Sequence, residues 1–259
     1  MERAHRLIEP YVGKEGVIGI YMVGSATRPY RDGLSDYDIE VIVEDDVYER
    51  TPDDERQVFS FKEGDERVVD YEFYLWPWSG FTGLAGSTQD MFHQPYQNAV
   101  ILYDPQGRIA PVIRGQAQLD EGVRLDRMRV HYLEFRFRLG RARKTANRDA
   151  SRRLNLGLLY GDAQRALVKL LFLVKRSWIS MGHWTEQELG ELGVPTELVE
   201  AIVPTFENPV SDAVRGLVER VDAWLTAEGE TFHTDPAALN TWAFHRSEGK
   251  AAFERWGGR

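Results

Sequence analysis

Short apolar runs bounded by turn residues dominate the first 110 positions of the chain. Val17–Val23 and Tyr37–Val43 are nearly continuous and rich in β-branched residues, a pattern typical of buried strands. Arg67–Trp76 alternates apolar and polar positions and stops before Pro77, which has no N–H to give to a sheet. With Ala99–Tyr103 as a fourth run, the pattern predicts a strand-rich α/β region.

Helical spacing takes over in the second half of the chain. Leu119–Arg143 and Leu154–Met181 carry apolar residues three and four positions apart with few breakers, and they predict two long helices. The change of pattern near 111–118 predicts two domains, 1–113 and 114–259. Shorter helices are expected at 2–14, 186–192, 197–203 and 210–228, with 45–59 partly helical and 80–97 a mixture of helix and loop.

Composition narrows the classes of protein. The chain has 259 residues, 42% of them hydrophobic, and no cysteine, which excludes disulfides, thiolate zinc sites and a cysteine nucleophile. No apolar segment has the length of a signal-peptide core or of a membrane span. We therefore expect a soluble, cytoplasmic protein with no membrane partner.

Charge is distributed unevenly along the chain. The net charge is −9, yet Arg124–Arg153 holds eleven Lys or Arg against three Asp or Glu. Two interpretations of this basic stretch stay open: a solvated helix face paired with acidic neighbours, or a surface that attracts triphosphate or another anion. A chain this acidic as a whole should repel nucleic acid, so a polynucleotide partner is disfavoured.

Candidate chemistry lies at the start of the second strand. Side chains alternate along a strand, so Asp36, Asp38 and Glu40 share one face. On the third strand the same alternation places Asp70 with Glu72. If the two strands are neighbours, these carboxylates converge, and a divalent cation such as Mg²⁺ relieves the repulsion between them. We favour Asp70 as the third ligand beside Asp36 and Asp38, and keep Glu72 as its substitute or as a general base.

Gly24 and Ser25, directly after the first strand, complement these carboxylates. Gly24 has no Cβ to keep a ligand away from the backbone, and Ser25 offers a hydroxyl and an N–H group. A short helix beginning after Ser25 would direct further N–H groups at an anion. The two residues therefore predict a phosphate cradle beside a metal site.

Together these motifs resemble a known family. Val23–Ser25, ten further residues, then Asp36–Ile39, with Val69–Phe73 later, resembles the DNA polymerase β-type nucleotidyltransferase superfamily over residues 15–110. The helical half, best marked at Ala166–Phe172, resembles more loosely the C-terminal bundle of aminoglycoside and related antibiotic nucleotidyltransferases. The resemblance implies an α/β (α+β) catalytic domain with a mixed, mostly antiparallel sheet, followed by an all-helical substrate-binding domain.

The resemblance also implies a reaction. Two Mg²⁺ ions held by Asp36, Asp38 and a third carboxylate would bind ATP or another nucleoside triphosphate, whose phosphates would lie against Gly24 and Ser25. A substrate hydroxyl would attack the α-phosphate, and pyrophosphate would leave. The cations that could neutralise the phosphates are Arg28 and Arg31 between the motif halves and Lys169 or Lys175 on the long helix.

The acceptor stays open between three hypotheses. The acidic net charge favours a small hydroxyl-bearing acceptor such as an aminoglycoside, and hence an adenylyltransferase of the antibiotic-resistance type, as a monomer or a homodimer. An RNA or protein acceptor would use the basic stretch, and a regulatory or antitoxin-like protein would bind nucleotide with little turnover. The aromatic side chains of Trp76, Trp78, Phe81 and Phe92 would line a sugar cleft in the first hypothesis, or else pack in the core.

Overall fold

The protein divides into two compact units, Met1–Gln118 and Leu119–Arg259, in a computed structural model that describes residues 1–180, 182–202 and 212–258. The boundary expected at 113/114 falls inside α4 (Ile109–Ala117), a helix that lies wholly within the first unit. No helix among the described residues is long and apolar enough to cross a membrane.

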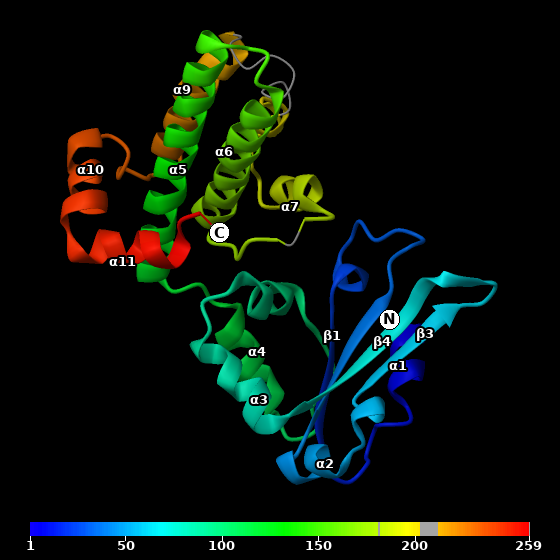
Figure 1. Ribbon diagram of the computed structural model, residues 1–259. Helices are drawn as coiled ribbons and strands as arrows, with labels where there is room; N and C mark the ends of the chain where they lie inside the picture. Colours follow the sequence, from blue (N-terminus) through cyan, green and yellow to red (C-terminus); the bar gives the residue numbers. More distant parts are fainter. Residues whose placement is uncertain (181, 203–211, 259) are drawn as a thin grey trace. The chain divides into compact units, whose positions relative to one another are not determined.

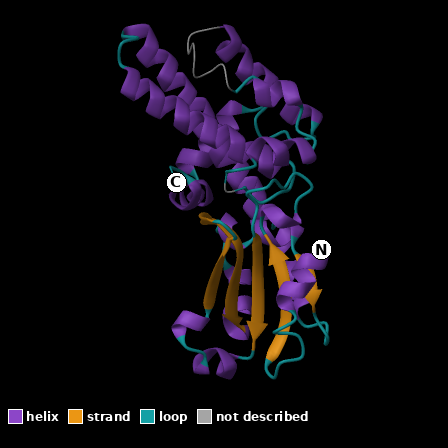
Figure 2. Ribbon diagram, turned by 90° about the vertical axis from the view of Figure 1, so that its right-hand side faces the viewer, coloured by secondary structure: helices purple, strands orange, loops and turns teal. Residues whose placement is uncertain are grey.

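The first unit is built on a five-stranded sheet of order β3-β4-β2-β1-β5, whose strands Figure 2 shows side by side. The parallel pair is β2 with β4, and the other three pairs, β1 with β2, β1 with β5 and β3 with β4, are antiparallel. The sheet is therefore mixed and mostly antiparallel, as expected. Its strands are β1 (Val17–Val23), β2 (Tyr37–Val43), β3 (Gln57–Lys62), β4 (Asp65–Pro77) and β5 (Val100–Tyr103).

The sequence pattern missed strand β3. The segment 45–59 was expected to be partly helical, and α2 (Asp45–Arg50) accounts for the helical part. Beyond it, β3 runs along the edge of the sheet with mostly exposed side chains, and Gly64, at φ 82°, turns the chain back into β4. Periodicity could not reveal this strand because neither of its faces is buried enough to be consistently apolar.

Helices cover both faces of the sheet (Figure 1). On one face, α1 (Glu2–Ile8) packs through Ala4 and Ile8, and the helix expected over 2–14 ends there. On the other face, α3 (Trp78–Gly83) and α4 pack through Phe81 and Ile109. Short 3-10 helices complete the unit: η1 (Ser25–Thr27), η2 (Asp53–Glu55), η3 (Leu84–Gly86), η4 (Asp90–Phe92) and η5 (Gln94–Asn98).

The second unit is helical, as the spacing predicted. Its core lies between α5 (Glu121–Arg148) and α6 (Arg153–Val174), the long pair that runs side by side in Figure 1. Three predicted helices reach beyond the described residues: position 181 at the end of the first, 203 at the end of the second, and 210 and 211 at the start of the third. The other helices are α7 (Thr185–Glu191), α8 (Thr196–Glu200), α9 (Asp212–Ala227), α10 (Pro236–His245) and α11 (Ser247–Trp256).

Part of the basic stretch Arg124–Arg153 is matched by acidic partners. This supports the first interpretation of its charge, since a paired cation attracts an outside anion less strongly. The ion pairs are Arg124 with Glu121 and Glu230, Arg129 with Asp126, Arg136 with Asp222, Arg138 with Asp162, and Arg152 with Asp149.

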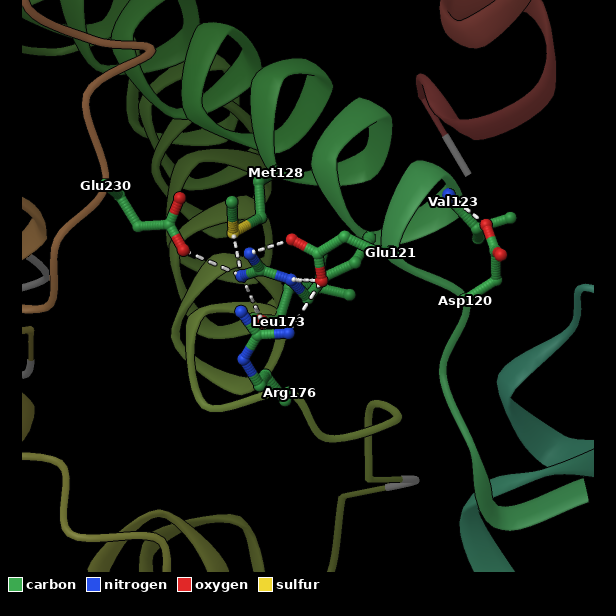
Figure 3. Close-up of polar contacts among 8 residues, drawn as sticks. Asp120, Glu121, Val123, Met128, Leu173, Arg176 and Glu230 are labelled. Atoms are coloured by element: carbon green, nitrogen blue, oxygen red, sulfur yellow. Dashed lines mark hydrogen bonds and ion pairs between the residues drawn. The ribbon is translucent and has the colours of Figure 1, made fainter. Parts of the chain in front are cut away.

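A buried arginine ties the helices of the second unit together (Figure 3). The side chain of Arg124 is 2% exposed, and its Nη1 donates to Glu230 Oε1 at 2.8 Å and to the Leu173 carbonyl at 3.2 Å. Its Nε and Nη2 donate to the Glu121 carboxylate at 2.9 and 2.7 Å. One guanidinium thus joins the start of α5, the end of α6 and the segment after α9.

We expect Arg124→Leu to lower the free energy of unfolding of the helical unit by about 3 kcal/mol, because it leaves the Glu230 carboxylate, whose side chain is 13% exposed, without its guanidinium partner. Urea denaturation followed by helical circular dichroism measures the loss. Arg152→Ala is the matched control: it removes an exposed ion pair with Asp149 and should cost no more than about 0.5 kcal/mol. Equal losses in the two variants would contradict a structural role for Arg124.

Candidate active site

The chain turns sharply at Gly24, directly beside Asp38. Gly24 adopts φ 73° and ψ −161°, a conformation open almost only to glycine. A Cβ built on Gly24 would lie 1.8 Å from Asp38 Oδ2. The end of β1 therefore touches the second carboxylate of the Asp36-x-Asp38 motif, and this contact requires a residue without a side chain.

The carboxylates predicted to share a face come from two neighbouring parallel strands. Asp38 on β2 is in register with Glu72 on β4, and Glu40 is in register with Tyr74. Burial, and then the negative charges of Asp36, Glu72 and Glu40, raise the pKa of Asp38 from 3.8 to about 7. Four acidic residues thus interact electrostatically at the start of β2.

Two tyrosines donate hydrogen bonds to the carboxylates of Glu40 and Glu72 on this face. Tyr21 on β1 donates its hydroxyl to Glu40 Oε2, and Tyr74 donates to Glu72 Oε2. Burial raises the pKa of Glu40 to about 7 even though the hydrogen bond from Tyr21 opposes the shift. The pKa of Tyr74 rises to about 12, first through burial and then through Glu72. The sequence placed Glu40 on this face but gave no sign of the tyrosines, which lie on other strands.

Asp70 does not join this group, contrary to the expectation from strand alternation. Opposite β3, the register shifts between Ser60, which pairs with Tyr71, and Phe61, which pairs with Val69, so Asp70 is the extra residue of a bulge. Its carboxylate forms an ion pair with Arg3 on α1, and the Arg3 guanidinium lies 5.6 Å from the centre of the Tyr37 ring. Alternation fails at a bulge, and the structure brings Glu72, rather than Asp70, beside Asp38.

The donor set fits a hard divalent cation in its chemistry. Its ligands are carboxylate oxygens, their mutual repulsion raises the pKa of Asp38, and a cation offsets both burial and repulsion. Within residues 1–180, 182–202 and 212–258, no three Asp, Glu, His or Cys side chains already stand as a ligand set. The Glu40 and Glu72 carboxylates instead accept hydrogen bonds from the hydroxyls of Tyr21 and Tyr74.

The loop between the motif halves is braced by its own side chains. Asp32 Oδ1 accepts hydrogen bonds from the backbone N–H groups of Leu34 at 2.9 Å and Ser35 at 3.0 Å. Arg31 Nη2 donates to the Tyr37 hydroxyl at 3.3 Å. The backbone N–H of Arg28 donates to the Ser25 carbonyl at 3.0 Å, closing the short turn η1. This loop delivers Asp36 to the start of β2.

The predicted phosphate-binding cations have protein partners. The Arg28 guanidinium lies against the side-chain amide of Asn98 on η5. Lys175, at the end of α6, forms an ion pair with Glu228 at 2.6 Å. Lys169 belongs to the helical unit, where it lines a polar cavity of about 50 Å³ with Glu134 and Arg165 among others. A triphosphate contact for Arg28 or Lys169 stays a prediction.

Of the two alternatives for the aromatic residues after the third predicted strand, a sugar cleft or the core, three of the four follow the second. Phe81 is fully buried on α3, and Trp76 and Trp78 pack against the same hydrophobic cluster. The Trp78 ring also receives the Arg108 guanidinium at 4.5 Å from its centre. Exposed aromatic side chains lie instead on the edge strand, where Phe59 is 46% exposed and Phe61 is 50% exposed. Sequence reasoning missed them because it did not predict β3.

Comparison with known proteins leaves the family of this chain unassigned. No model of a protein family matches the sequence, and no curated protein matches it. Among solved structures, a nucleotidyltransferase-like protein from Exiguobacterium sibiricum 255-15 is similar, with a TM-score of 0.47 and 14% identity over 99% of this chain and 87% of that chain. A likeness at this level assigns neither a family nor an activity.

Proposed function

We propose that the first unit is the catalytic domain of a metal-dependent nucleotidyltransferase, which transfers a nucleoside monophosphate, AMP from ATP in the simplest case, to a hydroxyl group. The observation that carries the proposal is the contact of Gly24 with Asp38, at the point where Asp38 also faces Glu72. This contact puts a tight turn that requires glycine directly beside a cluster of carboxylates. A nucleoside triphosphate with its divalent cation needs both features in one place.

Each residue of the site has a role in this proposal. Asp36, Asp38 and Glu72 would hold the cations, and Gly24 would leave room for the phosphates beside Asp38. A bound divalent cation would stabilise negative charge on the transferring phosphoryl group. Tyr74, whose hydroxyl donates to Glu72 Oε2, orients that carboxylate.

A small acceptor such as an aminoglycoside suits the charge of the protein. The net charge of −9 attracts a polycation and repels RNA. Pairing of part of the basic stretch with acidic side chains weakens the case for a nucleic-acid acceptor. We therefore place an aminoglycoside-like aminopolyol first among the acceptors.

Addition of MgATP tests the proposal, because a ligand of the native state raises its melting temperature. We expect stabilisation by MgATP that EDTA abolishes, and pyrophosphate release when an acceptor from an aminoglycoside panel is added. Absence of both effects, with MgATP and with MgGTP, would exclude this function. Stabilisation without pyrophosphate release for any acceptor would point instead to a nucleotide-binding regulatory protein.

The third carboxylate can be identified with a matched pair of variants. We expect Glu72→Gln to reduce pyrophosphate release by about a hundredfold, because it removes a charge that acts on Asp38. Asp70→Asn, which breaks the ion pair with Arg3, should change it by less than about threefold. Steady-state rates at saturating MgATP decide between them. A larger loss in Asp70→Asn would restore Asp70 as the ligand that alternation predicts.

A further inference from the structure

One row of side chains crosses strands β2, β4 and β3 at the level of Asp38. Asp38 on β2 is in register with Glu72 on β4, and Glu72 is in register with Phe59 on β3. Residues directly opposite each other on paired strands project from the same face. Phe59 therefore lies on the carboxylate face, two strand spacings, or about 10 Å, from Asp38.

Phe59 is exposed where an aromatic side chain would ordinarily be buried. It is 46% exposed although its ring contacts Tyr74, with centroids 6.3 Å apart in an edge-on arrangement. Phe61, two residues further along β3 and 50% exposed, continues the aromatic surface. We name Phe59 and Phe61 the β3 aromatic pair. Because β3 is the edge strand, no further strand of this unit lies beyond the pair.

The order of the strands in this row indicates whether the nucleotide or the acceptor would contact the β3 aromatic pair. In an in-line displacement at phosphorus, the attacking and leaving oxygens lie on opposite sides. Gly24 and Ser25, which would take the leaving pyrophosphate, lie at the end of β1, on one side of Asp38. Glu72 and Phe59 lie on the other side, where the attacking hydroxyl must enter.

Building on the proposed function, we propose that Phe59 is the acceptor-binding platform: the acceptor is a small cyclic aminopolyol whose apolar ring face lies on Phe59 while its hydroxyl points past Glu72 to the phosphate. The aromatic ring attracts ring C–H groups and the ammonium groups of such a molecule. The reacting bond forms between the acceptor oxygen and the α-phosphorus, the bond to pyrophosphate breaks, and the hydroxyl proton leaves to a base or to solvent.

A polypeptide acceptor bound along the exposed edge of β3 fits this geometry less well. A strand added beyond β3 would lie three spacings, or about 14 Å, from Asp38. This is further than a serine or tyrosine hydroxyl reaches from its own backbone. A small molecule bound on Phe59 needs to span only the two strand spacings between Phe59 and Asp38, so we favour a small-molecule acceptor.

Kinetics with kanamycin as the probe test this inference. We expect Phe59→Ala to raise KM for kanamycin at least about fivefold, as loss of a cation–π and stacking contact would. KM for MgATP should stay within about twofold, because the nucleotide lies on the Gly24 side. Phe59→Tyr keeps the ring and should retain the wild-type KM for kanamycin.

The control is Val58→Ala, on the same edge strand but paired with Phe73 of the opposite sheet face. It should leave both KM values unchanged. An unchanged KM for kanamycin in Phe59→Ala overturns the inference, as does a rise confined to KM for MgATP, which would assign the ring to the nucleotide. Transfer by the wild-type protein to a peptide or an RNA but not to kanamycin also overturns it.

Calorimetry with kanamycin alone separates this inference from the proposed function. If the wild-type protein binds kanamycin and Phe59→Ala binds it at least about fivefold more weakly, the platform holds even where no pyrophosphate is released. If MgATP stabilises the wild-type protein but kanamycin binds equally to both proteins or to neither, the platform is wrong and the nucleotide site stands.

Discussion

Asp38→Asn should abolish nucleotidyl transfer without weakening the fold. Asp38 lies against Gly24 and faces Glu72 across the parallel strand pair, and burial together with the charges of Asp36, Glu72 and Glu40 raises its pKa. Replacing it with a neutral isostere removes a cation ligand, and we expect pyrophosphate release to fall by at least about a thousandfold. The same substitution removes a charge that burial and repulsion disfavour, so the fold should be at least as stable at pH 8.

The pH dependence of unfolding follows from the pKa of Asp38. This pKa is about 7 in the folded chain against 3.8 for an unperturbed carboxyl, so between these values the folded state binds more protons than the unfolded state. The free energy of unfolding should therefore fall as pH rises from about 4 to about 7 in EDTA. Asp38→Asn should make this decline shallower but not remove it, because burial also raises the pKa of Glu40 to about 7. Mg²⁺ should offset the Asp38 contribution in the wild-type protein only.

Asp46→Asn is the control for both measurements, because Asp46 is exposed on α2 and paired with Arg50. It should retain wild-type turnover and the wild-type pH profile. Urea denaturation from pH 4 to pH 8 and pyrophosphate release at saturating MgATP provide the two readouts. Asp38→Asn with more than a tenth of wild-type turnover would contradict the proposed site.

Gly24→Ala should inactivate the protein by a steric route. The new methyl group would lie 1.8 Å from Asp38 Oδ2 and 2.9 Å from its Cγ, so the carboxylate has to move. A displacement of about 1 Å at a reacting centre costs about a hundredfold in rate, and we expect a loss of that order. The backbone at φ 73° and ψ −161° adds strain of about 2 kcal/mol for any residue with a Cβ.

Gly33→Ala is the matched control from the same loop. No atom lies within 4 Å of a Cβ at Gly33, and its φ is not in the left-handed region. We expect wild-type activity from it. Circular dichroism on Gly24→Ala distinguishes a folded, inactive protein from an unfolded one, and Mn²⁺ affinity reports the displaced carboxylate directly. A Gly24→Ala protein that turns over normally would show that the turn and Asp38 do not act together.

The bulge at Asp70 marks the limit of pattern reasoning for this site. Alternation correctly placed Asp38 and Glu40 on one face, because β2 is regular from Tyr37 to Val43. On β4 the same rule grouped Asp70 with Glu72, and one extra residue against β3 broke it. A bulge depends on the partner strand, and β3 itself gave no periodic signal because its side chains are mostly exposed.

The sequence by itself determined the two kinds of secondary structure, the change from one to the other near residues 111–118, and the Gly24-Ser25 and Asp36-x-Asp38 motifs. These depend on local pattern, since burial of one face imposes a period of two or of 3.6 along the chain. Only the tertiary structure decided that Glu72 faces Asp38, that Arg124 and Arg136 of α5 pair with Glu230 and Asp222, and that Phe59 is exposed beside the carboxylates. Each of these rests on a contact between segments far apart in sequence, and no local period records such pairing.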